Sequence, residues 1–424
     1  MRCLVALVCL AGIAHADVPT TARPGLAFGS YLELVARGNI ELAAQRAGVS
    51  VTEAQIAIAK IFPDPQLTAS VLSVDASGTG SPTIFGVSVS QTIELGGKRG
   101  ARIAATRDDL SAARATLEDF LRTLRGESTD AFVDALARRL VLDRKVQTLA
   151  SLERLVAVNE QRLKAGDIGE IALIQSRVEA RKFQGEVLSA RADLREAELA
   201  LALKIGFLPN VEQITPLGEL RVQTRAFKID ELIERAKQQR PDVRARRFAV
   251  DAARSRIRLA HANRWTDLTL TLGWDHSLVP SGIFEQIAPA PSFDALSASI
   301  SLPLPFSRVY KGELTGAQFT ETVNEWQLRS AELHVEVEIR QAAAKYDAAV
   351  ERVQLYNSGL LRDAERVLEA KLYSYQRGDI PLLEVLEAQR TVNDVYLAYF
   401  DALADHAHSL VALEQAAGIW DIQF

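Results

Sequence analysis

The side chains that most often carry chemistry are scarce in this chain. Both cysteines, Cys3 and Cys9, lie within the first 16 residues, and five histidines follow that segment: His261, His276, His334, His406 and His408. None of these histidines stands in a sequence arrangement with a nucleophile or a carboxylate. His406 and His408 are two residues apart, a spacing that does not share a helix face. We therefore expect no enzyme activity, no resident metal and no other cofactor.

Two short motifs remain as candidates for chemistry. Glu384 and Glu387 are three residues apart in a predicted helix, so both carboxylates point to one face. Surface glutamates of this kind are usually only solvated. The run 96–100 reads GGKRG, but it lacks the spacing of a phosphate-binding loop and has no Ser or Thr after its lysine. We interpret it as a glycine turn that leads into a helix.

The N-terminus reads as a secretory signal peptide over residues 1–16. Arg2 supplies a positive end, an apolar run extends from Cys3 to Ile13, and residues 14–16 (AHA) form a small-x-small cleavage site. After residue 16 no run approaches the ~18 apolar residues of a transmembrane helix. A secreted chain of this kind would enter a membrane only as a closed β-barrel. The net charge of −5 indicates no nucleic-acid partner.

The chain repeats itself. Residues 166–177 (GDIGEIALIQSR) match residues 378–390 (GDIPLLEVLEAQR) at an offset of 378 − 166 = 212. Earlier segments repeat in the same order, residues 39–67 with 240–268 and residues 88–100 with 299–312. This order predicts a first repeat over 17–210, an equatorial linker over 211–228, a second repeat over 229–418 and a tail over 419–424.

Each repeat reads helix, strand, strand, long helix, tight turn, helix. The strands are expected at about 66–75, 83–93, 267–276 and 295–305. In the third strand, leucines at 268, 270 and 272 alternate with polar residues and precede Trp274. Such strands fit a solvated antiparallel sheet or a membrane barrel with a polar lumen and Trp274 at the lipid interface. The signal peptide and the duplication favour the barrel.

The helix lengths favour a cylinder of parallel rods. Long helices are expected at about 98–163 and 312–376, each roughly 100 Å long. Shorter segments reach the same length when they stack end to end, and we expect 169–205 to stack on 229–262 and 381–417 on 26–60. A heptad ladder that includes Leu142, Leu149 and Val156 suits coiled-coil packing between neighbouring rods.

The strand count sets the expected assembly. Four strands cannot close a barrel, eight nearly fill the interior with side chains, and twelve leave room for an aqueous lumen. Cyclic symmetry then predicts a homotrimer with a 12-stranded β-barrel and a 12-rod α-helical barrel. The expected fold class is mainly α with a membrane β-barrel portion.

Residues 90–101 (SQTIELGGKRGA) resemble the strand-to-helix junction of the outer-membrane efflux protein family, to which TolC belongs. The likeness covers nearly all of 25–418 and is closest to the heavy-metal-resistance branch, which is CzcC- and CusC-like. At this junction the paired Gly96 and Gly97 let the chain turn sharply out of the barrel. Lys98 and Arg99, with Arg102, are then expected near the periplasmic face of the membrane.

The resemblance implies a passive conduit in the outer membrane with a long periplasmic extension. Its partners would be outer-membrane lipid, a periplasmic adaptor and an inner-membrane pump. The adaptor-docking tips would be the two turns Gly166-Asp167-Ile168 and Gly378-Asp379-Ile380. Each glycine can end its helix in the left-handed conformation, and each aspartate can cap the next helix. A plain helical hairpin is the alternative for either turn alone.

The resemblance also implies a pore gate near these tips, closed by a ring of acidic side chains. The matching positions are Glu384 and Glu387, where the TolC pattern has aspartates, together with Tyr375. An arginine of that pattern is replaced here by Ile380, so the latch between helices is expected to differ.

Three alternatives stay open on the sequence alone. The first is a duct of the same family for drugs or other organic compounds, because an outer conduit need not recognise its cargo. The second is an enzyme. The third is a periplasmic coiled-coil adaptor or scaffold, although adaptors have one hairpin flanked by β domains. The aromatic C-terminus, Phe424, resembles the last strand of a single-chain barrel, but it follows a helix that ends at Gly418, so we expect a periplasmic tail.

Overall fold

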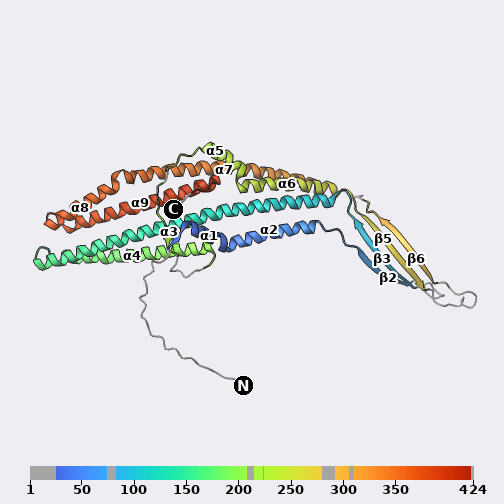
Figure 1. Ribbon diagram of the computed structural model, residues 1–424, viewed down its shortest axis with the longest axis horizontal. Helices are drawn as coiled ribbons and strands as arrows, with labels where there is room; N and C mark the ends of the chain where they lie inside the picture. The colour runs from blue at the N-terminus through green and yellow to red at the C-terminus, as the bar shows by residue number, and fades with distance from the viewer. Residues whose placement is uncertain are drawn as a thin grey trace, which may run out of the picture.

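The computed structural model is an elongated bundle of helices with a small sheet at one end (Figure 1). It describes residues 25–73, 83–207, 214–222, 224–278, 292–304 and 310–421. The predicted signal peptide, both loops between paired strands and the last three residues of the tail lie outside the described residues. No helix in the described ranges is long and apolar enough to cross a membrane.

The order of elements confirms the duplication. The first repeat contains α1 (Phe28–Gly38), α2 (Ile40–Ala59), β2 (Gln66–Ser73), β3 (Thr83–Ile93), α3 (Lys98–Ala165) and α4 (Glu170–Ile205). The second contains α5 (Ile229–Gln239), α6 (Pro241–Ala262), β5 (Leu268–Leu278), β6 (Phe293–Ser301), α7 (Tyr310–Leu355), α8 (Leu361–Arg377) and α9 (Leu382–Ala417). Two short strands, β1 (Leu26–Ala27) and β4 (Pro216–Leu217), pair in parallel.

The four longer strands form one antiparallel sheet in the order β2-β3-β5-β6. The central pair joins the two repeats, with Thr92 opposite Thr269. Side chains of β2 and β6 are exposed on both faces of the sheet in the single chain. The large apolar side chains of Leu272, Leu296 and Ile300 are among the exposed ones. The last strand ends at Ser301, earlier than the predicted 305. Within the described part of the chain, strands β2 and β6 each have one unpaired edge.

Helix α3 runs without a break through Gly126, as expected for one long helix over about 98–163. A Cβ atom at Gly126 would lie 2.2 Å from Oε1 of Gln415 in α9. The glycine therefore permits a close approach between two helices and does not end a helix.

The expected second long helix, 312–376, is broken, and this prediction was wrong. Residues 356–360 form a π-type turn between α7 and α8, and Gly359 inside it has φ of 132°. A side chain at that φ is strained, so glycine is the residue that tolerates such a break. Helical periodicity continues on both sides of Gly359, which is why the sequence read as one helix.

The predicted stacking of the short helices was also wrong. The C-terminal end of α4 meets the α1–α2 corner, because Asn39 donates a hydrogen bond to the Lys204 carbonyl. The end of α9 meets the start of α6, because Arg240 donates to the Ala416 carbonyl. Each spliced rod is thus built within its own repeat. The four rods of the chain are α2 with α4, α3, α6 with α9, and α7 with α8.

Candidate functional site

The junction between the sheet and α3 depends on two glycines. Gly96 has φ of 70° and Gly97 has φ of 75°, both in the left-handed region that favours glycine. A Cβ atom on Gly96 would lie 2.6 Å from Cδ1 of Trp265 and 2.9 Å from the Ala262 carbonyl. The predicted sharp turn at this point is confirmed.

Charged side chains lock this junction. Lys98 Nζ lies 2.7 Å from Asp267 Oδ1, the oxygen that also accepts from the Leu95 amide. Arg102 donates to both carboxylate oxygens of Glu94 at 2.8 and 3.2 Å, and its Nε donates to the Ala59 carbonyl. Arg99, in turn, donates to the Lys60 carbonyl at 2.9 Å. The basic cluster therefore ties the end of α2 to the start of α3.

The two tips have the same backbone geometry. Gly166 has φ of 82° and Gly378 has φ of 85°. The Asp167 amide donates to the Arg162 carbonyl and the Asp379 amide donates to the Ser374 carbonyl, which closes both helices with a Schellman motif. The left-handed glycines are confirmed, and Ile168 and Ile380 follow them in the turns.

The predicted capping by aspartate is wrong at both tips. Helix α4 begins at Glu170 with Gly169 as its N-cap, and α9 begins at Leu382 with Pro381 as its N-cap; neither has a side-chain cap. Each aspartate lies too early in its turn, because two further residues extend the chain before the helix starts.

Tyr375 is buried between the two hairpins. Its hydroxyl donates to Asn159 Oδ1 at 2.8 Å, and its carbonyl accepts from Arg162 at 3.0 Å. Arg162 also lies 4.9 Å from the centroid of the Tyr375 ring. Burial raises the pKa of Tyr375, so the hydroxyl stays protonated and remains a donor. Arg162 thus supplies a cationic link between α3 and α8, whereas position 380 holds an isoleucine.

Asn159 and Arg162 were missed by the sequence analysis. Both lie within an ordinary polar stretch of a long helix, and neither is marked by a turn or a repeat match. Only the packing of α8 against α3 shows that they contact Tyr375.

The two candidate gate glutamates differ in their surroundings. Glu384 is half-buried and forms an ion pair with Lys371 of α8, whereas Glu387 is exposed. One turn further along α9, Arg390 binds Glu179 of α4 through two hydrogen bonds of 3.1 and 2.8 Å. The hydrogen bonds from Arg390 lower the pKa of Glu179, so this pair is charged. Among the described residues Glu387 forms no ion pair, and only the nearby Arg390, which is bound to Glu179, offsets part of its charge.

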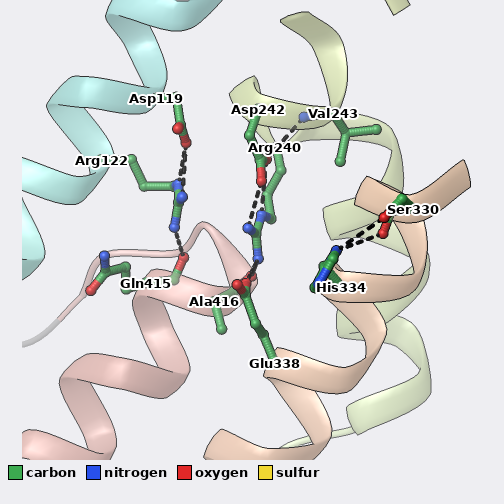
Figure 2. A network of polar contacts seen from close by, with 10 residues as sticks. All are labelled: Asp119, Arg122, Arg240, Asp242, Val243, Ser330, His334, Glu338, Gln415 and Ala416. Atoms are coloured by element: carbon green, nitrogen blue, oxygen red, sulfur yellow. Dashed lines mark hydrogen bonds and ion pairs between the residues drawn. The ribbon is translucent and has the colours of Figure 1, made fainter. Parts of the chain in front are cut away.

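The two joints of the spliced rods obey the repeat. Asn39 and Arg240 are related by the offset 240 − 39 = 201, and their acceptors, on residues 204 and 416, by 416 − 204 = 212. Asn39 Oδ1 also accepts from the Leu42 amide and caps α2. Arg240 instead forms ion pairs of 2.7 Å with both Asp242 and Glu338, as Figure 2 shows.

Near the joints, α9 carries one unusual histidine. His408 Nδ1 lies 2.8 Å from Asp130 and Nε2 lies 3.0 Å from Asp134, so both ring nitrogens meet carboxylates of α3. Burial disfavours the charged imidazole, but the hydrogen bonds to the two aspartates outweigh it and raise the pKa to about 9. No cluster of three or more metal-ligating side chains exists among the described residues.

Similar proteins share this architecture along almost the whole chain. The family model described as outer membrane efflux protein matches residues 32–206 and 232–419. The cobalt-zinc-cadmium resistance protein CzcC of Cupriavidus metallidurans is 23% identical over 403 residues, which cover 94% of this chain and 92% of that protein. The outer membrane efflux protein BepC of Brucella suis is 24% identical and covers 90% of this chain and 83% of that protein.

Solved structures show the same fold. A structure of CusC superposes with a TM-score of 0.74 at 17% identity and covers 92% of each chain. The outer-membrane channel OprN also gives 0.74, at 19% identity, and covers 96% of this chain and 97% of that one.

Proposed function

We propose that three copies of this chain form a passive duct for heavy-metal cations, because the chain belongs to the outer membrane efflux protein family. Members of this family are trimeric outer-membrane channels of tripartite efflux systems. In this proposal a periplasmic adaptor and an inner-membrane pump deliver the cargo, and the chain itself catalyses nothing. The metal cargo rests on CzcC, a relative named for cobalt, zinc and cadmium resistance. A duct for organic compounds is the second candidate, favoured by the likeness to BepC.

The observation that carries the duct is the arrangement of four rods with one open sheet. Strands β2 and β6 leave unpaired edges, which a second copy can pair. Both outer rods expose large apolar side chains that one chain leaves uncovered, including Val178, Leu188 and Leu203 on α4 and Phe319, Trp326 and Leu333 on α7. These two rods lie at opposite sides of the protomer, so a ring of copies would bury them together.

The gate in this proposal is a ring of carboxylates near the tips. Threefold symmetry would bring Glu384 and Glu387 of three chains around a narrow lumen. Since Lys371 compensates Glu384, Glu387 supplies most of the net charge. Carboxylate oxygens suit hard cations, and their charges add in a confined space. In this proposal Tyr375 contributes by holding α8 against α3, through its contacts with Asn159 and Arg162, and does not itself line the lumen.

Docking of the adaptor is assigned in this proposal to the two tips, Gly166-Asp167-Ile168 and Gly378-Asp379-Ile380. Their matched backbone geometry supports this assignment, because it presents two similar turns at the end of the bundle opposite the sheet (Figure 1).

The proposal is tested on the protein in detergent and in planar bilayers. Mass determination should give three copies, and the channel should be cation-selective with block by multivalent cations from the periplasmic side. The double variant Glu384→Ala/Glu387→Ala should lose most of the selectivity and the block, whereas Glu170→Gln, an exposed glutamate of the other hairpin, should change neither. A dominant monomer or dimer would refute the trimer, and wild-type selectivity in the double variant would refute the gate.

A further inference from the structure

A cleft of about 400 Å³ opens where α3 passes the joint between α6 and α9. Four arginines from two rods line it: Arg122, Arg125, Arg240 and Arg244. Glu118 and the indole of Trp420 in the C-terminal tail complete the wall. Its volume is in the range of cavities that hold one small molecule.

Three of the four arginines have partners inside the fold. Arg122 bonds Asp119 and the Gln415 carbonyl (Figure 2). Arg240 binds Asp242, Glu338 and the Ala416 carbonyl. Arg244 forms an ion pair of 2.6 Å with Glu118 at the cleft wall. These contacts fix the positions of the arginines and leave little freedom for them to collapse into the cleft.

Arg125 is different. Within the described residues it forms no ion pair with a carboxylate, and its guanidinium lies 4.9 Å from the ring centroid of Trp420. Burial lowers the pKa of Arg125, and the nearby Glu414 compensates only in part. Burial raises the pKa of Glu414 itself to about 8, so at neutral pH that carboxyl is mostly uncharged. Arg125 is therefore a stacked, partly desolvated cation that no carboxylate among the described residues binds directly.

The cleft lies in the middle of the protomer. It is formed by α3, the α5–α6 corner and the end of α9, whereas the rods with exposed apolar stripes are α4 and α7. A ring of protomers would thus leave the cleft open. Helix α5 forms an extra layer against α6 and α7, since Ile233 and Ala236 pack in the same core as Val335 and Ile339. Such a layer fits outside an open tunnel, and Gln239 at the end of α5 lines the cleft.

We propose that this cleft binds a small periplasmic anion that carries a carboxylate or phosphate group. The Arg125 guanidinium offers paired donors to such a group, in the geometry that makes arginine the common ligand of planar oxyanions. Trp420 offers an aromatic surface to a ring attached to the anion. Two sources share this chemistry, the carboxylated amino sugars of the cell wall and free phosphate compounds. The placement outside the tunnel rests on the proposed function, but the binding itself does not.

Isothermal titration of the detergent-solubilised full chain at low ionic strength tests the proposal. The probes are N-acetylmuramic acid, which carries a carboxylate, N-acetylglucosamine, which lacks it, and inorganic phosphate. We expect saturable binding of at least one anionic probe and none of the neutral sugar. Binding of the carboxylated sugar alone would assign the cell wall as the source, and binding of phosphate would assign a free phosphate compound.

Variants locate the site. Arg125→Gln should weaken binding of the anionic probe at least tenfold. Arg125→Lys keeps the charge but loses the paired donors, so its affinity should lie between those of the wild type and Arg125→Gln. Arg138→Gln is the matched control, because Arg138 is exposed on the same helix outside the cleft. No saturable binding by either anion, or equal binding by wild type and Arg125→Gln, would overturn the proposal. Bilayer conductance of the same preparation reports the duct separately, so the two proposals fail independently.

Discussion

In the first repeat Asn39 joins α2 to α4, whereas in the second repeat Arg240 joins α6 to α9. Both side chains donate to the last turn of the helix that ends at the joint, and both are nearly buried, at 7% and 3% exposure. The side chain of Asn39 connects α2 and α4 and uses a neutral amide. Arg240 also binds Glu338 of α7, so one guanidinium connects three helices.

This difference shows what a duplicated fold keeps. The position of the joint is the same in both repeats, but the chemistry that holds it is not. Gly206 and Gly418 illustrate the shared part, since both end their helices in the left-handed conformation, with φ of 91° and 71°. We therefore expect the second joint to tolerate substitution much less than the first.

The largest expected effect is at Arg240. Replacement by alanine leaves Asp242 and the Ala416 carbonyl without their buried partner. Because Asp242 and Glu338 stay 29% and 50% exposed, we expect a cost of about 3 kcal/mol, the lower end for a broken buried ion pair. Thermal unfolding of the detergent-solubilised protein should show a large drop in Tm. Arg246→Ala, at an exposed position of the same helix, should change Tm little. Equal stability of the two variants would refute the buried network.

The ion pairs of His408 with Asp130 and Asp134 have no counterpart in the first repeat. The equivalent position there, 408 − 212 = 196, holds a glutamate. The pKa of His408 is raised to about 9, above the ordinary ~6.5. Its stabilising contribution is therefore complete below pH ~6.5 and is lost as pH rises through about 9. Because the His408 side chain is 31% exposed, solvent screens the ion pairs, and we expect a contribution on the order of 2 kcal/mol.

Unfolding measured between pH 6 and 10 checks this expectation. His408→Gln should remove most of the loss of stability that occurs near pH 9, and the wild type should show it clearly. If the two proteins have the same pH profile, the His408 ion pairs do not stabilise the fold.

A smaller effect is expected at the first joint. Asn39→Ala removes the N-cap of α2 and the donor to α4, which should cost about 1–2 kcal/mol. Asn39→Ser keeps a capping oxygen for α2 but is too short to donate to the Lys204 carbonyl, so it should cost less than alanine. If Asn39→Ala destabilised the protein as much as Arg240→Ala, the second joint would not be the less tolerant of the two.

The smallest expected effect distinguishes the two long rods. Gly359→Ala introduces a side chain at φ of 132° and should cost about 1 kcal/mol, or straighten α7 into α8. The position one repeat earlier, Gln147, lies in unbroken α3, and Gln147→Gly should cost about 1 kcal/mol through helix propensity. Hydrogen exchange should show faster opening near 359 than near 147 in the wild type.

The sequence predicted the features that depend on local backbone chemistry. Gly166 and Gly378 end their helices as expected, and Gly96 with Gly97 turns the chain out of the sheet. The strand pairs and the unbroken first long helix, α3, also follow from periodicity. All of these are properties of a few neighbouring residues.

The features that failed depend on contacts between distant segments. Either end-to-end stacking of the short helices gives rods of equal length, so length could not choose between them. The choice is made by the bonds of Asn39 and Arg240, which are 165 and 176 residues away from their acceptors. Gly359 failed for a related reason, since a single glycine leaves helical periodicity intact on both sides.

The joints also have a mechanical consequence. Helix α3 is continuous where it passes the two joints, at which α2 meets α4 and α6 meets α9. Helix α7 is also continuous there, and its break at Gly359 lies further toward the tips. In each chain a stiff rod thus stands beside a rod that is interrupted at mid-length. A cylinder of this construction resists stretching along its axis through its continuous members, while its interrupted members allow it to bend. Consider a duct that is held at one end in a membrane and at the other end by separate partners. When the membrane and the partners move relative to each other, such a duct would bend at mid-length, and the lumen at its two ends would keep its shape.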